Sequence, residues 1–585
     1  MKFNNKHFLT TFIMKKNIYL KGAAATVLSL ALASCASDYL DTPTHGNIDS
    51  DEVCATTETA HQAVIGACQG LAGVWSYDLL YQFLGIGDVA VGTFYGEMPG
   101  SDSFNNFFLD VNPSWDIYYR MDDTMGKGNY VWDEKTWMWA YAMIGQVNEV
   151  LDGIDGAAGS DEERAFTKAE ALTLRAHCYW RLLQAYAPRW EASNNGQSLS
   201  VILRVSAKQE QDLPLSPMID VLDQMYADLD EAIVNYKAAG SYRRTLTYEP
   251  DLSVCYGVYA RTAALKNDWE KVKTMAHNAR QGFHSATKEE AFSGYCAYVN
   301  NEWMWSGSFA AVDDHVYSNW STNWACNGFR ACNASGTNRI NIDLYNKIPE
   351  TDARRDLWMT VDKLDVDRSL IYNAKNINPL NMDIRQRTVR RAATAWIEDH
   401  QNKNDGFTDL AYTSKGQTEG SDQDVTAPVI CDGAQMKFWS KGLLGQNGWG
   451  FPPFMRATEM YLLEAEACAM LGQSGEAQAI LNEVNRKFNP DYTCTATGQQ
   501  LIDEVRDYTR IELWGEGFCW FNLKRWGLNL TRRAWMAGDP ASGNLPAAIE
   551  CNVGPNDANL WRYGIPRSET NYNVNVTYPY PGNGM

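Results

Sequence analysis

The sequence contains none of the compact motifs that identify common enzyme active sites. It has no GxSxG nucleophile elbow, no GxxxxGK phosphate-binding loop and no HExxH metal-binding pair. It also has no CxxC motif, which excludes a zinc ribbon and a thioredoxin-like redox site. The eight histidines are scattered along the chain. The sequence therefore predicts no catalytic residue, no metal site and no cofactor.

Positive charge is also scarce. The chain has 51 Lys and Arg against 71 Asp and Glu, a net charge of −20. Nucleic-acid binding requires a basic face, so nucleic acid is excluded as a partner. The same charge disfavours strongly anionic substrates. No segment is long and apolar enough to cross a bilayer, because the clearest apolar run, 23–33, is too short.

That short apolar run instead belongs to an export signal. Lys15, Lys16 and Lys21 precede it, and Leu32-Ala33-Ser34 leads directly into Cys35. A charged start, a short apolar centre and small residues before a cut are typical of a secretory signal peptide. We expect the signal to occupy 1–34, with Met14 as the true start.

Cys35 follows a sequence that resembles a bacterial lipobox. This resemblance implies that Cys35 is the lipidated N-terminus of the mature chain, with 35–51 as an acidic tether. A diacylglycerol plus an amide-linked chain suffices for stable membrane anchoring. The alternative is an ordinary signal peptide with an incidental cysteine.

Aromatic residues are abundant, with 21 Trp and 30 Tyr in 585 residues. Most are expected to fill the interior, and an excess this large also indicates rings that stack on a ligand. Twelve further cysteines sit mostly alone inside helical patterns, where a free thiol packs as a small apolar residue. A disulfide between Cys326 and Cys332 stays open.

Helical periodicity dominates much of the chain and predicts a mostly α-helical fold. Ser160 with Glu163 forms a capping box, and Ser216 with Pro217 is expected to begin another helix. Small residues at the expected helix contacts resemble those of tetratricopeptide repeats, which build a superhelix of paired helices. The expected pairs are 52–75 with 137–155, 160–187 with 216–240, two helices within 252–282, and two within 456–488.

Two regions lack this periodicity, namely 76–132 and 283–454. Both are rich in loop-forming and aromatic residues, and long ordered loops in compact proteins are usually functional. Within the second region, Trp303 and Trp305 alternate as in a half-buried strand and are expected in the core. This irregular part forms the second half of the predicted architecture.

The C-terminal region 501–585 contains the most distinctive stretch. A helical period from Leu501 is interrupted by Gly515 and Gly517, and an aromatic and basic segment follows. This stretch resembles the C-terminal signature of the SusD/RagB family, the surface glycan-binding lipoproteins of Bacteroidetes-type bacteria. The matching residues are Glu512-Leu513, Glu516-Gly517, Trp520, Leu523 and Arg525-Trp526.

The usual Arg and Asp of that signature are replaced by Cys519 and Asn522. These positions are three apart and can face each other on one helical turn. Other family landmarks occur in the family's order, so the resemblance covers 52–585. They are Asp343-Leu344-Tyr345 with Asp352 and Arg354-Arg355, Arg456 with Glu459, Glu464 to Ala467, and Ile565-Pro566 with Glu569.

The resemblance implies a lipid-anchored protein on the cell surface of the outer membrane. It would bind an oligosaccharide or polysaccharide without cleaving it. It would also cover a SusC-like TonB-dependent transporter, with its helical repeats forming the contact. The lipid at the N-terminus would be its one attachment to the membrane.

A glycan site requires flat aromatic platforms for the sugar rings and polar groups for the hydroxyls. The resemblance places the binding face in 77–132 and 313–339. The candidate platforms are Tyr95, Trp115, Trp320 and Trp324, with Asn105, Asn323, Asp88 and Arg330 as polar partners.

Three alternatives remain at this stage. A RagB-like relative would capture peptides with the same scaffold, and a tetratricopeptide adaptor would bind proteins alone. Carboxylates are abundant but their spacing singles out no glycosidase couple. The pairs Asp122-Asp123 and Asp313-Asp314 are expected in solvated loops, and a structural calcium ion there stays open.

Overall fold

The computed structural model describes a large part of the chain beyond Glu52. The described residues belong to one compact unit that begins at Val53. Cys35, the leader and the tether therefore lie outside them. The described residues are 53–72, 88, 92, 97, 99–104, 131–294, 301–307, 338–360, 433–438, 450–536, 538–545, 547–557 and 561–576.

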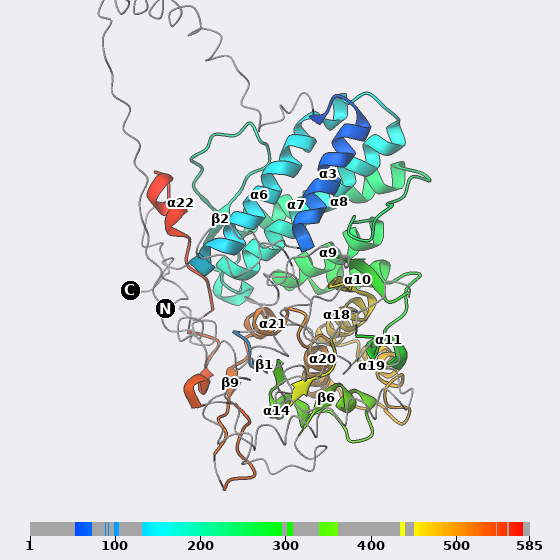
Figure 1. Ribbon diagram of the computed structural model, residues 1–585, viewed down its shortest axis with the longest axis vertical. Coiled ribbons are helices and arrows are strands. Elements are labelled where there is room, and N and C mark those ends of the chain that lie inside the picture. The colour runs from blue at the N-terminus through cyan, green and yellow to red at the C-terminus, as the bar shows by residue number, and fades with distance from the viewer. Residues whose placement is uncertain are drawn as a thin grey trace, which may run out of the picture. The chain divides into compact units, whose positions relative to one another are not determined.

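The fold is mostly α-helical, and its long helices pack in pairs, as the sequence predicts (Figure 1). α3 packs with α6, α7 with α8, α9 with α10, and α18 with α19. α6 also packs on α7, and α8 on α9, so the pairs stack in a continuous row. The helices of this row are α3 (Thr57–Ala72), α6 (Val131–Gly153), α7 (Asp161–Tyr186), α8 (Met218–Ala238), α9 (Leu252–Leu265), α10 (Trp269–Ala279), α18 (Ala457–Met470) and α19 (Ser474–Asn485).

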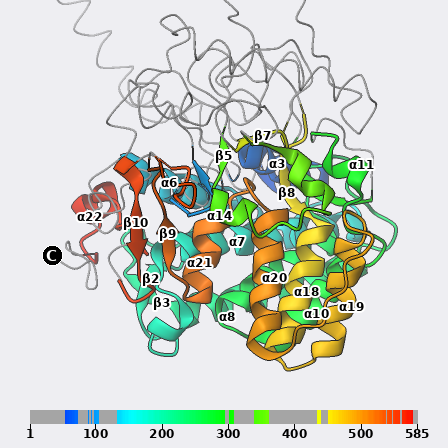
Figure 2. The same ribbon diagram turned by 90° about the horizontal axis from the view of Figure 1, so that it is seen from below.

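The row continues across a long gap in the sequence, because α10 packs directly on α18. α20 (Gly498–Glu512) packs on α18 and α19. Viewed from below, α20, α18 and α19 lie side by side, with α21 (Cys519–Trp526) next to α20 (Figure 2). The shorter described helices are α11 (Lys288–Ala291), α14 (Ile342–Tyr345) and α22 (Arg567–Tyr572), with the 3-10 helices η3 (Ile154–Gly156), η4 (Trp190–Ala192), η5 (Ala353–Leu357) and η7 (Ala547–Ile549).

Strands are few and short. β1, β5, β7 and β6 form a four-stranded antiparallel sheet in that order, and three two-stranded pairs accompany it. The strands of the sheet are β1 (Ser103–Phe104), β5 (Arg339–Ile340), β7 (Ala434–Gln435) and β6 (Trp358–Met359). The pairs are β2 (Leu199–Ile202) with β3 (Leu215–Pro217), β4 (Trp303–Ser306) with β8 (Pro453–Arg456), and β9 (Leu530–Arg532) with β10 (Cys551–Val553).

Strand β4 confirms the expected core position of Trp303 and Trp305, since both side chains are buried. Trp303 lies opposite Arg456 of β8, which ties this strand to the start of α18. Aromatic rings also fill the core below α21, where Trp520 stacks on Trp561 with ring centroids 5.9 Å apart. Such offset ring contacts add to the free energy gained from burying apolar area.

Two expected helix starts need correction. Ser160 caps α7 by accepting from the Glu163 N–H at 3.1 Å, but the Glu163 carboxylate does not complete a box. It accepts instead from the Thr57 hydroxyl at 2.5 Å, a contact that joins α3 to α7. Helix α8 begins one residue later than expected, with Pro217 as its N-cap and no side-chain cap. A tertiary contact replaces the capping box at Glu163, whereas Pro217 stays in strand β3, opposite Leu199 of β2.

Within the described part of the chain, no helix combines the length and apolarity needed to cross a bilayer. The eight described cysteines are all free thiols, and Cys326 and Cys332 lie outside this part.

Candidate functional site

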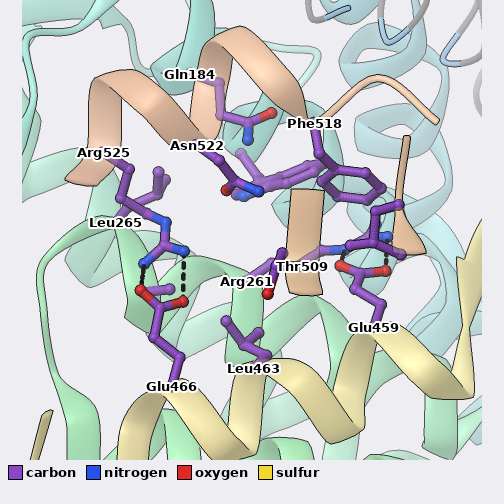
Figure 3. A pocket seen from close by; sticks show the side chains of 13 residues that line it. Gln184, Arg261, Leu265, Glu459, Leu463, Glu466, Thr509, Phe518, Asn522 and Arg525 are labelled. Atoms are coloured by element: carbon purple, nitrogen blue, oxygen red, sulfur yellow. Dashed lines mark hydrogen bonds and ion pairs between the residues drawn. The ribbon is translucent and has the colours of Figure 1, made fainter. Parts of the chain in front are cut away.

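The helical row and α21 line a small pocket with a cavity volume of about 40 Å³ (Figure 3). Its walls come from α7, α9, α18, α20 and α21, so residues far apart in sequence meet there. This volume accommodates a few water molecules and is smaller than a typical small-ligand site. The lining residues are Trp180, Gln184, Arg261, Ala264, Leu265, Glu459, Leu463, Glu466, Thr509, Leu513, Phe518, Asn522 and Arg525.

Two carboxylates of α18 form the charged floor of the pocket. Glu459 accepts from Arg261 Nε at 2.7 Å and from Arg261 Nη2 at 2.6 Å. Two turns further along the helix, Glu466 accepts from Arg525 at 3.0 and 2.7 Å. Both pairs are bidentate, which fixes the position of each side chain. These carboxylates are therefore occupied by arginine and are not free to act as an acid, a base or a nucleophile.

An aromatic wall and an amide complete the pocket. Two guanidinium groups lie over the Trp180 ring, those of Arg181 at 4.4 Å and Arg261 at 4.7 Å from its centroid. Phe518 lies across the pocket, and the half-buried Asn522 side chain points into the cavity (Figure 3). Among the described residues, no hydrogen bond uses the Asn522 amide. The pocket thus offers an amide and a ring edge to a neutral polar group.

The two residues that depart from the family signature have different surroundings. Cys519 is buried against Gly100 and Asp102, and burial together with the Asp102 charge raises the pKa of its thiol well above the usual range. Asn522 lines the pocket beside Trp180. The signature motif identifies Asn522 and Arg525 in the sequence. The residues of α18 that lie near them in the pocket can be identified only from the fold.

The carboxylates of the signature lie in a buried ionic cluster below the pocket rather than on its surface. Arg456 donates to Glu516 through two nitrogens, each at 2.8 Å, and to Glu302 Oε1 at 2.6 Å. Lys437 Nζ also donates to Glu516 Oε1 at 2.6 Å. Arg354 reaches the other signature carboxylate, with Nη1 3.2 Å from Glu512 Oε2.

The pKa directions follow from this packing. Burial alone raises the pKa of Glu516, but the charges of Arg456 and Lys437 outweigh it and hold that pKa below its usual value. At Glu302 burial prevails over Arg456 and raises the pKa to about 7. These residues hold β4, β8 and the end of α20 together, which is a structural role.

Of the eight expected ligand contacts, the structure describes Asp88. Its carboxylate accepts from His177 Nε2 at 2.8 Å and from Arg181 at 2.7 and 3.1 Å. Asp88 is 2% exposed, so the expectation that it faces a ligand is corrected: it is a buried partner of α7. The remaining seven, Tyr95, Asn105, Trp115, Trp320, Asn323, Trp324 and Arg330, lie outside the described residues.

The fold and the pocket define a helical-repeat protein in which the C-terminal helices α20 and α21 pack against the last helix pair, α18 and α19. Two family models match this chain. One, described as the SusD family, matches residues 320–582, and the other, described as starch-binding associating with outer membrane, matches residues 93–262. The chain belongs to the SusD-like family.

Solved structures show the same fold. A SusD-like carbohydrate-binding protein from Bacteroides vulgatus ATCC 8482 is 18% identical, with a TM-score of 0.65 over 90% of this chain and 98% of that chain. A SusD superfamily protein from Bacteroides thetaiotaomicron VPI-5482 is 16% identical, with a TM-score of 0.63 over 89% of this chain and 98% of that chain. No curated protein matches the chain.

Proposed function

We propose that this chain is a lipid-anchored protein of the outer-membrane surface that captures oligosaccharides or polysaccharides for uptake. The observation that carries the proposal is the match of SusD family models to both halves of the chain. One of these models is described as starch-binding associating with outer membrane, and one similar solved structure is that of a SusD-like carbohydrate-binding protein. The lipobox-like sequence before Cys35 supplies the anchor.

The glycan is held by the aromatic loops, with Tyr95, Trp115, Trp320 and Trp324 as platforms. The sugar hydroxyls form hydrogen bonds with Asn105, Asn323 and Arg330. A ring that removes roughly 50–100 Å² from water contributes about 1–3 kcal/mol. Two or three such platforms, less the ordering cost of association, give a Kd of about micromolar to millimolar. Such an affinity suits capture followed by release.

The released glycan passes to a SusC-like TonB-dependent transporter, on which this protein sits as a lid. The paired helices from α3 to α19 supply the contact surface. Their tetratricopeptide-like stacking supports this role, because helical repeats present extended surfaces to protein partners.

The proposal is tested by incubating the purified full chain with a panel of oligosaccharides. Binding is measured by calorimetry, and released reducing ends are measured in the same samples. We expect saturable binding of at least one glycan class and no new reducing ends. Release of reducing ends that is lost on replacing a pair of carboxylates would instead identify a glycosidase.

Peptide competition separates the two kinds of cargo. An unlabelled glycan should displace a bound labelled glycan, whereas a mixed peptide library should not. Displacement by peptides alone would favour the RagB-like alternative. If neither glycans nor peptides bind, the result would favour an adaptor that binds proteins alone.

A further inference from the structure

Three ionisable side chains from distant parts of the sequence converge inside the first half of the helical row. His61 lies on α3, Glu170 on α7, and Glu249 in the segment before α9. His61 Nε2 lies 2.9 Å from Glu249 Oε2 and 3.2 Å from Glu170 Oε2. In the described part of the chain, this is the one group of three or more His, Cys, Asp or Glu whose ligand atoms lie within 4.8 Å of one another.

The group is buried and short of positive charge. Glu170 and Glu249 are fully buried and His61 is 5% exposed. With a neutral imidazole, the three side chains carry two negative charges. The nearby Arg244 is already paired with Asp251 at 3.2 Å. Buried carboxylates require a compensating cation, because desolvation penalises their charge.

Glu170 is the least satisfied member of the group. Neither of its carboxylate oxygens accepts a hydrogen bond, although the side chain lies beside His61 and is fully buried. Buried polar atoms in folded proteins are almost always paired. A buried carboxylate that accepts no hydrogen bond, and that shares its contact with His61 with a second carboxylate, indicates a position for a bound cation.

The other two side chains are held in place by a second layer of contacts. Glu249 Oε1 accepts from the backbone N–H of Leu246 at 2.6 Å and of Thr245 at 3.1 Å, so Oε2 is left to face His61. The Tyr242 hydroxyl lies 3.3 Å from His61 Nδ1, so Nε2 faces the carboxylates. Metal-binding histidines and carboxylates are typically oriented in this way.

We propose that His61, Glu170 and Glu249 bind one divalent cation, Zn²⁺. Zinc–nitrogen and zinc–oxygen bonds of about 2.0–2.2 Å place neighbouring ligands of a tetrahedron roughly 3.3 Å apart. The observed distances of 2.9 and 3.2 Å from His61 Nε2 approach this value before any ion is present. Glu170 brings two oxygens that accept no hydrogen bond, so three side chains supply four donor atoms.

The ion would join the first helix of the compact unit to the rest of the fold. α3 directly follows the segment that we propose as the lipid tether. Glu170 and Glu249 lie more than a hundred residues further along the chain, and a metal bridge closes these long loops. The site is independent of the proposed glycan site, so either proposal can fail without the other.

The test uses the purified full chain, stripped of metal by chelation and then titrated with Zn²⁺ against a competing chelator. Elemental analysis should give one zinc per chain, and Co²⁺ should give the visible absorption of a four-coordinate site. Zn²⁺ should raise the Tm of the chelated protein. H61Q and E170Q should each weaken Zn²⁺ binding at least tenfold and abolish the Tm shift.

H277Q is the matched control. His277 also contacts a carboxylate, Glu464 at 3.0 Å, but it is exposed and lacks a second acidic partner of this kind. H277Q should therefore retain one zinc and the full Tm shift.

The rival account is a protonated His61 that pairs with the two carboxylates without a metal. In that case E170Q alters Tm, but the wild-type Tm does not respond to chelation or to Zn²⁺. That result, or equal zinc binding by wild type, H61Q and E170Q, overturns the proposal. The wild-type measurements decide the matter even if a variant fails to fold.

Discussion

Arg456 and Glu516 are joined by two parallel hydrogen bonds, Nε to Oε2 and Nη2 to Oε1, each 2.8 Å long. Arg456 lies at the end of β8, and Glu516 follows α20, so this pair fastens the C-terminal segment to the start of the last helical repeat. Both side chains are buried. Glu516 of the family signature therefore has a structural role at this junction.

Removing Arg456 should destabilise the protein strongly. In R456M, the carboxylates of Glu302 and Glu516 lose their main partner inside the fold. Breaking a buried pair on one side typically costs about 3–5 kcal/mol. Urea denaturation should show a loss of this order, and R456K, which keeps the charge but not the paired geometry, should lie between R456M and wild type.

The control for this prediction is R533M. Arg533 pairs with Asp343 at the surface, where both side chains are more than a third exposed. Exposed pairs contribute at most about 1 kcal/mol. Equal losses for R456M and R533M would show that the buried junction has no special weight.

Glu302 should make stability depend on pH. Burial raises its pKa from 4.5 to about 7 despite the nearby Arg456. The native state therefore holds this proton more tightly than the unfolded chain, and the stabilisation present below pH 4.5 is lost as the pH rises to about 7. E302Q has no such proton to lose.

E302Q should consequently gain stability relative to wild type between pH 5 and pH 7, by up to about 1.4 kcal/mol for each pH unit. The gain should level off above pH 7. Denaturation of both proteins at pH 5, 6, 7 and 8 measures it. A difference that stays constant over this range would contradict the raised pKa.

Gly517 should tolerate no side chain. Its φ is +89°, and an added Cβ would lie 2.6 Å from the carbonyl carbon of Gly92. G517A combines left-handed strain with a backbone clash, and we expect a loss above about 2 kcal/mol. Thermal denaturation provides the measurement.

Gly472 separates the two effects. It also has a positive φ, +74°, but an added Cβ there would meet open space. G472A should lose only about 1 kcal/mol from backbone strain. A loss for G517A no larger than that for G472A would show that the contact with Gly92 is not tight.

The sequence predicts the helical half of this fold well, because the period of apolar residues and the breaking glycines are local signals. Gly472 ends α18, and positive φ angles at Gly515 and Gly517 follow the end of α20, as expected. The capping error at Glu163 arises because a distant residue intervenes. Glu163 bonds to Thr57, 106 residues away, and no local pattern reports such a contact.

The interior ionic groups could not be predicted for the same reason. Arg456 and Glu302 are 154 residues apart, and His61 and Glu249 are 188 apart. Asp88 lies in the segment where the family resemblance places the binding face, yet the fold buries it against α7. The residues next to Asp88 in the sequence do not indicate which distant side chain will pair with its carboxylate.

The most direct test of glycan capture is the affinity of the double variant W320A/W324A. Calorimetry with the best glycan of the panel should show binding at least tenfold weaker than wild type, with a nearly unchanged Tm. Y572A, which removes an aromatic ring that is 82% exposed on α22, should bind as wild type does. Unchanged glycan affinity in W320A/W324A, or a large drop in its Tm, would contradict the assignment of these tryptophans to the binding face.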